Sequence, residues 1–269
     1  MNWIDLEQVT LRYTLSGSGP VPLVLIHELG GSLESFDALM PCLERDFRVL
    51  RYDQRGAGWS EKPRKPFTIA DHARDLRQLL DALGLAGPVC LAGVAAGAAI
   101  AVVHALNDPA AVHGLALCSP ALTVAEDRVR YLVDRSERAM REGMAAIVDA
   151  SLARSFPSVV RGDPAAYTAY RARFLASDPV GYAYANMALA DVRLDAQLRG
   201  LDLPCLVLAG THDLLRPPEA VSALSAQLPR AIYAEIDSGH IMPVQASEAM
   251  ATHLRHFFAS VTRDALMRA

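Results

Sequence analysis

Residues 88–97 read PVCLAGVAAG, an apolar run that leads into a Gly-x-x-x-Gly turn. The helix-like segment 98–106 follows at once. Gly93 and Gly97 allow the close packing that a sharp turn between a strand and a helix demands. The stretch therefore predicts a strand, a tight turn centred on Ala95 and a helix. An ordinary small-residue turn has the same composition, so this stretch alone leaves its function open.

Further short runs rich in Val, Leu and Ile recur before glycine or polar turns. Continuously apolar runs of this length are typical of strands covered on both faces, as in a parallel sheet. Helix-like segments lie between them; in segment 68–83, Thr68 and Asp71 resemble a capping box and Gly84 can end the helix. The alternation predicts an α/β fold with a doubly wound, mostly parallel sheet. The predicted strands are 21–27, 47–53, 88–92, 114–118, 204–210 and 232–237.

Two segments depart from this alternation. Residues 8–15, followed by the turn SGSGP, are interpreted as an antiparallel edge strand. Residues 122–198 are mostly helical in pattern, with breaks near three prolines, before strand character returns. We interpret 122–198 as a helical cap inserted into a core formed by 1–121 and 199–269.

The composition limits the possible partners. A chain of 269 residues with 52% hydrophobic residues can bury a large core. A net charge of -4 without a Lys/Arg stretch argues against nucleic acid and favours a small-molecule substrate. No signal peptide and no run of about 20 apolar residues is evident, so we expect a cytoplasmic protein that does not associate with membranes. The four cysteines lack metal-ligand spacing, and we predict no metal site.

Polar loops follow the predicted strands. HELGGS at 27–32 and DQRGAGWS at 53–60 come after the first two parallel strands, while GTHD at 210–213 and SGH at 238–240 come after the last two. With the turn at 93–97, this order resembles the α/β-hydrolase superfamily. Such enzymes place an oxyanion loop, a nucleophile turn, an acid and a histidine at these positions. The resemblance implies an α/β-hydrolase core with a helical cap.

More narrowly, the whole chain resembles 3-oxoadipate enol-lactonases. RYDQRGAGWS at 51–60, REGM at 141–144 and DPVGY at 178–182 carry this similarity, together with the GTHD and SGH loops. Such enzymes hydrolyse a strained, carboxylate-bearing lactone with a Ser/His/Asp triad and use no cofactor. The resemblance therefore implies hydrolysis of a lactone, an ester or a related ring-cleavage product, without a cofactor.

The resemblance assigns roles to individual residues. His240 corresponds to the general base and Asp213 to the carboxylate that fixes the histidine tautomer and stabilises the imidazolium. The backbone N–H groups of Leu29 and Ala96 correspond to the oxyanion donors. Ala95 occupies the nucleophile position, where a strained backbone with positive φ is expected.

Four further groups are weaker candidates. His27 and Glu28 belong to the oxyanion loop and are candidate substrate-binding residues. For His27, a hydrogen-bonded structural role is the simpler interpretation. Glu28, where the family usually has glycine, is either a second acid or base or a group that points into solvent. Asp53 and Arg55 are interpreted as structural.

A stripe of arginines in the cap is a further candidate. Arg135, Arg138 and Arg141 lie three residues apart, and therefore near one face of a predicted helix. They either contact an anionic substrate or form a solvated cationic stripe, and the solvated stripe is the simpler interpretation.

Alanine at position 95 leaves three hypotheses. An alanine methyl can neither attack a carbonyl nor release a proton. If alanine is natural, His240 and Asp213 act without covalent catalysis, either by activating water or by abstracting a proton for a cofactor-independent lyase, decarboxylase or oxygenase reaction. If alanine replaces a native serine, the chain is an inactivated hydrolase. In the third hypothesis the chain binds a small molecule without turnover.

Overall fold

The computed structural model describes residues 1–85 and 87–266. Its strands form one eight-stranded sheet in the order β1-β2-β4-β3-β5-β6-β7-β8. All pairings from β4 to β8 are parallel, which confirms the predicted doubly wound sheet. The strands are β1 (Asn2–Asp5), β2 (Thr10–Ser16), β3 (Val21–Ile26), β4 (Phe47–Tyr52), β5 (Val89–Val94), β6 (Val112–Cys118), β7 (Cys205–Gly210) and β8 (Ala231–Ile236).

The antiparallel end of the sheet differs from the prediction in one respect. The segment predicted as an edge strand is β2, which pairs antiparallel with β4. It is not the edge, because β1 pairs along its outer side from Asn2 opposite Tyr13 to Asp5 opposite Thr10. Four mostly exposed residues give β1 no apolar run, so the sequence pattern does not indicate it.

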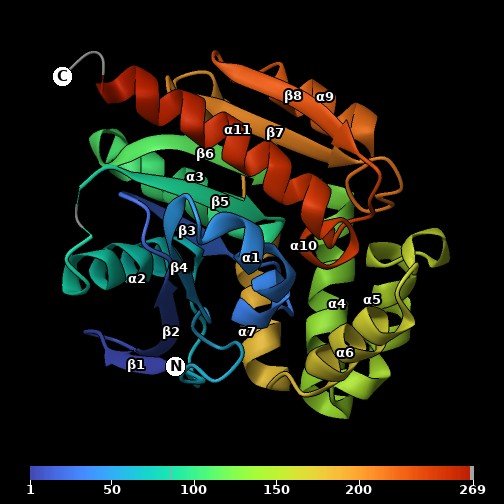
Figure 1. The fold of residues 1–269 in the computed structure, drawn as a ribbon. Coiled ribbons are helices and arrows are strands. Elements are labelled where there is room, and N and C mark those ends of the chain that lie inside the picture. Colours follow the sequence, from blue (N-terminus) through green and yellow to red (C-terminus); the bar gives the residue numbers. More distant parts are fainter. Residues whose placement is uncertain (86, 267–269) are drawn as a thin grey trace.

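Helices cover both faces of the sheet (Figure 1). Successive residues of β5 point to opposite faces, so Leu91 packs with α2 and α3 while Cys90 packs with α1 and α11. The helix predicted at 68–83 is α2, and Thr68 and Asp71 form the expected reciprocal capping box. The core helices are α1 (Met40–Leu43), α2 (Ile69–Ala82), α3 (Ala96–Asn107), α9 (Pro218–Ser225), α10 (Met242–Gln245) and α11 (Ser247–Leu266), with 3-10 helices η1 (Leu33–Leu39) and η2 (Pro109–Ala111).

A helical cap lies between β6 and β7, beside the carboxyl ends of the strands (Figure 1). Its base is closed where the Leu194 N–H donates to the Leu122 carbonyl at 3.0 Å. Phe156, Tyr170 and Phe174 pack into a buried cluster of its own. The cap contains α4 (Glu126–Glu142), α5 (Val148–Ser155), α6 (Pro164–Leu175), α7 (Pro179–Ala190) and α8 (Asp195–Leu198), with 3-10 helices η3 (Met144–Ala146) and η4 (Ser158–Val160).

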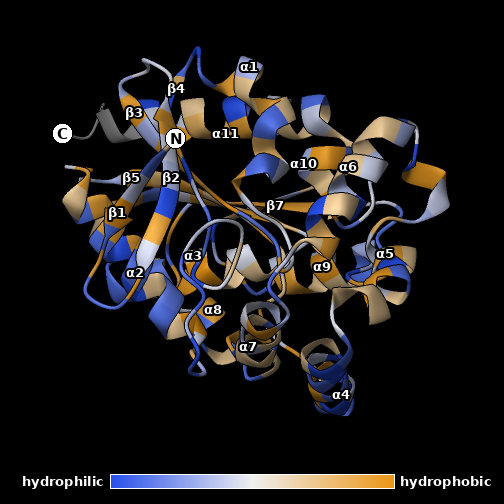
Figure 2. Cartoon of the chain, turned by 90° about the horizontal axis from the view of Figure 1, so that it is seen from below, coloured by the Kyte–Doolittle hydropathy of each residue, from blue (hydrophilic) through white to orange (hydrophobic). Residues whose placement is uncertain are grey.

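Hydrophobic residues are distributed as the layered fold requires. Figure 2 shows β7 in the hydrophobic interior and α4 as a largely hydrophilic helix at the periphery. Accordingly, β7 is buried throughout, whereas α4 buries only Ser136 and Ala139. Within residues 1–85 and 87–266, no helix combines the length and the apolar character needed to cross a bilayer.

Candidate active site

The turn between β5 and α3 has the strained geometry that its sequence predicts. Ala95 adopts φ 51° and ψ -110° and is buried. A Cβ added to Gly97 would lie 2.2 Å from the Ile26 carbonyl oxygen, and one added to Gly93 would lie 2.4 Å from the Gly97 carbonyl oxygen. Both glycines are therefore required by close backbone contact, and together they hold Ala95 at the head of α3.

Two backbone N–H groups are available beside Ala95. Ala96 is the first residue of α3, where an N–H has no partner within the helix. Leu29 lies in the loop after β3, and the hydrogen bonds of the described residues include no acceptor for its N–H or for that of Ala96. Both residues line the same cavity as Ala95. The positions fit a pair of donors to an oxyanion.

The loops after β7 and β8 bring Asp213 and His240 together. Asp213 Oδ2 lies 2.8 Å from His240 Nδ1, and both side chains are at least nine-tenths buried. Asp213 Oδ1 accepts the N–H groups of Leu215 and Arg216 at 2.7 and 2.9 Å. The backbone N–H of His240 donates to the backbone carbonyl of Ser155 at 3.2 Å, which fixes the loop after β8 against the cap. Asp213 therefore orients the imidazole and leaves Nε2 for chemistry.

The surroundings of Asp213 keep it ionised. Burial by itself would raise the pKa of this carboxyl, but the charge of His240, their hydrogen bond and the Arg216 N–H outweigh it and lower the pKa. The buried Ser119 hydroxyl lies near enough to contribute to this lowering, although its geometry falls short of a full hydrogen bond. An ionised Asp213 can stabilise a protonated His240.

One cavity of about 330 Å³ joins these parts. Ala95, His240 and the two N–H donors all line it, so the convergence predicted from the sequence is present. Its outer wall comes from the cap helices α4 to α7. On the core side it is lined by Glu28, Leu29, Ala95, Ala96, Arg216 and His240.

His27 does not line this cavity; it lines a smaller pocket beside it, between the loops after β3 and β4 and helix α7. Its Nε2 accepts the Gln54 N–H at 3.1 Å, and its Nδ1 lies 2.7 Å from the Glu28 carbonyl oxygen. Both ring nitrogens are therefore used by the backbone, which requires the neutral tautomer protonated on Nδ1. His27 is buried and joins the loops after β3 and β4, as the simpler interpretation proposes.

Glu28 is buried at the cavity wall, which excludes the interpretation that it points into solvent. Its Oε1 accepts the hydroxyls of Ser35 at 2.8 Å and of Tyr170 in α6 at 2.9 Å. Oε2 has no partner among the described residues. Burial, followed by the charge of Glu28, raises the pKa of Tyr170, so the phenol stays protonated and donates. Glu28 thus links the oxyanion loop to the cap.

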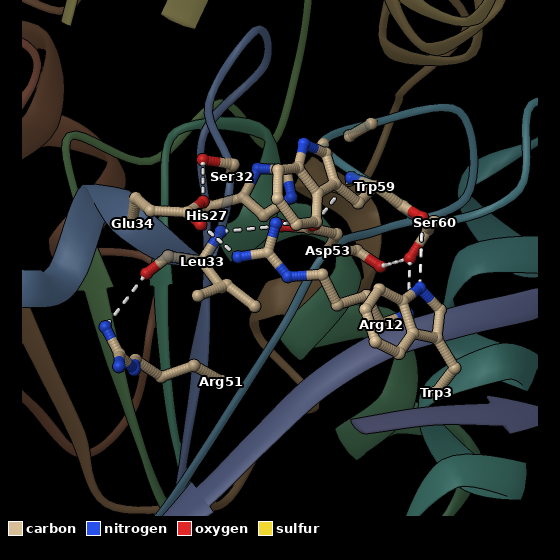
Figure 3. Close-up of polar contacts among 12 residues, drawn as sticks. Trp3, Arg12, His27, Ser32, Leu33, Glu34, Arg51, Asp53, Trp59 and Ser60 are labelled. Atoms are coloured by element: carbon tan, nitrogen blue, oxygen red, sulfur yellow. Dashed lines mark hydrogen bonds and ion pairs between the residues drawn. The ribbon is translucent and has the colours of Figure 1, made fainter. Parts of the chain in front are cut away.

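Asp53 links the segments that follow β3 and β4 (Figure 3). Its carboxylate accepts the N–H groups of Leu33 at 2.8 Å and Trp59 at 2.7 Å and pairs with Arg12 at 3.2 Å. Arg55 forms a bidentate pair with Asp75. Both residues are buried in structural networks, as the sequence indicates. They hold the loops after β3 and β4 in place.

Cap arginines reach the cavity, and sequence reasoning identified only one of them. Arg135 lines the cavity, whereas Arg138 and Arg141 pair with Glu142 at the surface. Three further arginines line it: Arg128 in α4, Arg154 in α5 and Arg216 after β7. The spacing of Arg128 and Arg135, seven residues or two turns apart, could have indicated this inner face.

The fold and the loops around this cavity define a protein of the α/β-hydrolase type. A model of the alpha/beta hydrolase fold matches residues 21–246, and the chain belongs to that family. Among curated relatives, the poly(3-hydroxyalkanoate) depolymerase of Ectopseudomonas oleovorans is 24% identical over 98% of this chain and 94% of its own.

Two solved structures have the same fold over nearly their whole length. The enol-lactonase from Burkholderia xenovorans LB400 has a TM-score of 0.91 and 30% identity, and the match covers 96% of this chain and 100% of that chain. A thermophilic esterase from Thermogutta terrifontis, with malate bound, has a TM-score of 0.89 and 28% identity over 94% of each chain.

Proposed function

We propose that this chain is an enzyme that hydrolyses a small ester or lactone bearing a carboxylate. The observation that carries the proposal is the cavity shared by the His240–Asp213 pair, the N–H groups of Leu29 and Ala96, and the Ala95 methyl. The similarity to proteins named as an esterase and an enol-lactonase supports ester and lactone chemistry. The arginines of the cavity wall support an anionic substrate.

Water is the nucleophile in this proposal, because the methyl of Ala95 cannot attack. His240 Nε2 takes a proton from water as the hydroxide oxygen bonds to the carbonyl carbon. The N–H groups of Leu29 and Ala96 stabilise the resulting oxyanion, and Asp213 stabilises the imidazolium. As the carbon–oxygen bond to the leaving group breaks, His240 returns the proton to the departing oxygen.

Ala95 also favours a second candidate, because proton abstraction from carbon needs no nucleophile. His240 would remove a proton bonded to a carbon beside the carbonyl, and the two N–H groups would hold the enolate. Elimination, and oxygenation by dioxygen without a cofactor, proceed through such a carbanion, whereas decarboxylation reaches the same enolate by losing carbon dioxide. This candidate uses the same residues and differs from hydrolysis in its product.

Replacing His240 tests both candidates, with His212 as the matched control. His212 lies in the neighbouring loop and pairs with the exposed Asp237 at 3.0 Å. We expect His240→Ala to lower kcat/KM on small carboxylate-bearing esters and lactones by about a hundredfold or more and to flatten the pH–rate profile. The His212→Ala variant should keep the kcat/KM and the pH–rate profile of the parent chain. Equal rates and pH profiles in the two variants would contradict the proposal, and saturable binding without product would favour a binding protein.

A further inference from the structure

Three arginines converge on the catalytic cavity from separate elements. Arg128 belongs to α4, Arg154 to the last turn of α5, and Arg216 to the loop after β7; we call them the arginine cluster. No member forms an ion pair with a carboxylate of the described residues. Arg154 and Arg216 reach only backbone carbonyls, at 3.3 and 3.4 Å, and Arg128 lies over the Tyr131 ring.

The absence of acidic partners is confined to the cavity side of α4. On its outer side, Arg130 pairs with Asp134 at 2.7 Å and Arg138 pairs with Glu142 at 3.1 Å, each with the acid four residues later. The cavity-lining Arg128 is followed at that spacing by Leu132. The helix therefore pairs Arg130 and Arg138 with acids, whereas its cavity-lining arginines, Arg128 and Arg135, have no carboxylate partner among the described residues.

The carboxylates of the cavity compensate the cluster only in part. Asp213 is committed to His240 and to two backbone N–H groups, and Glu28 accepts two hydroxyls. Burial lowers the pKa of Arg216, Asp213 raises it, and the charges of Arg128 and Arg154 lower it further. Arg216 therefore experiences the charges of two other arginines that line the same cavity, and a bound anion would offset them.

We propose that the arginine cluster binds a doubly charged group of the substrate, either a phosphate monoester or two neighbouring carboxylates. The inference rests on the proposed function and narrows its substrate class. A single carboxylate is satisfied by one bidentate guanidinium, whereas three guanidinium groups supply donors and charge for a dianion. His240 and the N–H donors line the same cavity, so the group to be cleaved would belong to the same molecule.

Calorimetric titration with three small anions at about pH 8 tests the inference, since a phosphate monoester is doubly charged there. The probes are butyrate, succinate and propyl phosphate. We expect succinate or propyl phosphate to bind about tenfold or more tightly than butyrate, because each additional charge-assisted hydrogen bond adds affinity. The dianion that binds more tightly shows whether the cluster prefers two carboxylates or a phosphate monoester. Equal affinity for butyrate would overturn the inference.

Matched double variants assign the effect to the cluster. R128Q/R154Q should weaken binding of the better dianion about tenfold or more, whereas R130Q/R171Q, which removes two cap arginines paired with acids, should change it less than about twofold. Equal effects would overturn the inference. Arg128 is exposed, so the single variant R128Q should fold even if the double variant does not, and its affinity for the dianion can still be measured. Binding is measured without turnover, so a failure of hydrolysis leaves this result intact.

Discussion

The turn after β5 and the loops after β7 and β8 open on one cavity but supply different parts of the proposed catalytic site. The turn keeps its backbone: Ala95 has φ 51°, the flanking glycines are packed against carbonyls, and Ala96 presents its N–H. The loops keep their side chains, with Asp213 and His240 2.8 Å apart. The difference shows that backbone geometry and reactive side chains are held by separate physical constraints.

The strained turn at Ala95 does not require a reactive side chain at that position. Positive φ costs a non-glycine residue on the order of 1 kcal/mol or more. Gly97 must pack on the Ile26 carbonyl whatever residue stands at position 95, so the surrounding structure imposes the strain. The same turn presents the Ala96 N–H at the cavity, a function that an alanine at position 95 leaves intact.

Adding the missing hydroxyl should have the largest effect. Removing the serine of a complete triad costs about a millionfold in kcat. If the retained pair is poised for a nucleophile at position 95, we expect Ala95→Ser to raise ester or lactone hydrolysis by about a thousandfold or more. Steady-state rates measure the gain, and mass spectrometry detects an acyl-enzyme.

The double variant Ala95→Ser with His240→Ala serves as the control, because a serine without its base should return to the starting rate. A folded Ala95→Ser variant with no gain would show that the turn and the histidine loop are not aligned for covalent catalysis. The turn after β5 would then serve only to bind an oxyanion, through the Ala96 N–H, and not to position a nucleophile for His240.

Altering the backbone of the turn should have the next largest effect. Gly97→Ala places a Cβ 2.2 Å from the Ile26 carbonyl oxygen, a contact with backbone that no side-chain rotation relieves. We expect the free energy of unfolding to fall by about 3 kcal/mol. Gly162→Ala is the control, because its added Cβ has no heavy atom within 4 Å. Equal urea midpoints in the two variants would refute the packing constraint.

Sequence patterns predicted the elements that depend on local signals. Apolar runs and turn residues gave the parallel strands, and the family motifs placed Ala95, Asp213 and His240 on loops that do meet. Strand β1 was missed because its four residues, which are mostly exposed, show no alternation of apolar and polar side chains. Arg154 was missed because its approach depends on how the cap helices are rotated, which local sequence does not specify. Arg128 was missed although its spacing of seven residues from Arg135 places both on one face of a helix.

The least local contact was also the least predictable. Glu28 accepts a hydrogen bond from Tyr170, 142 residues later in the chain. No spacing rule connects a loop of the core to a helix of the cap at that separation. The choice between a solvated and a buried Glu28 therefore depended on tertiary packing alone.

Replacing the side chain of Asp213 should have the smallest effect on stability and a distinctive pH dependence. Its pKa is lowered in the folded state relative to the ordinary value of 3.8, so its contribution to stability is present above that value. The contribution is lost as pH falls through the lowered folded pKa. We expect Asp213→Asn to reduce the free energy of unfolding by about 1–3 kcal/mol near neutral pH, because it removes a charge-assisted hydrogen bond.

Urea unfolding from neutral to strongly acidic pH measures this prediction. The difference between the parent chain and Asp213→Asn should be present at about pH 4 and above and shrink below it, because protonation removes the charge that the variant already lacks. Asp237→Asn is the matched control, since Asp237 also pairs with a histidine but is 88% exposed, and it should change stability little at any pH. A difference that persists undiminished at strongly acidic pH would show that an ionised Asp213 does not stabilise the folded chain.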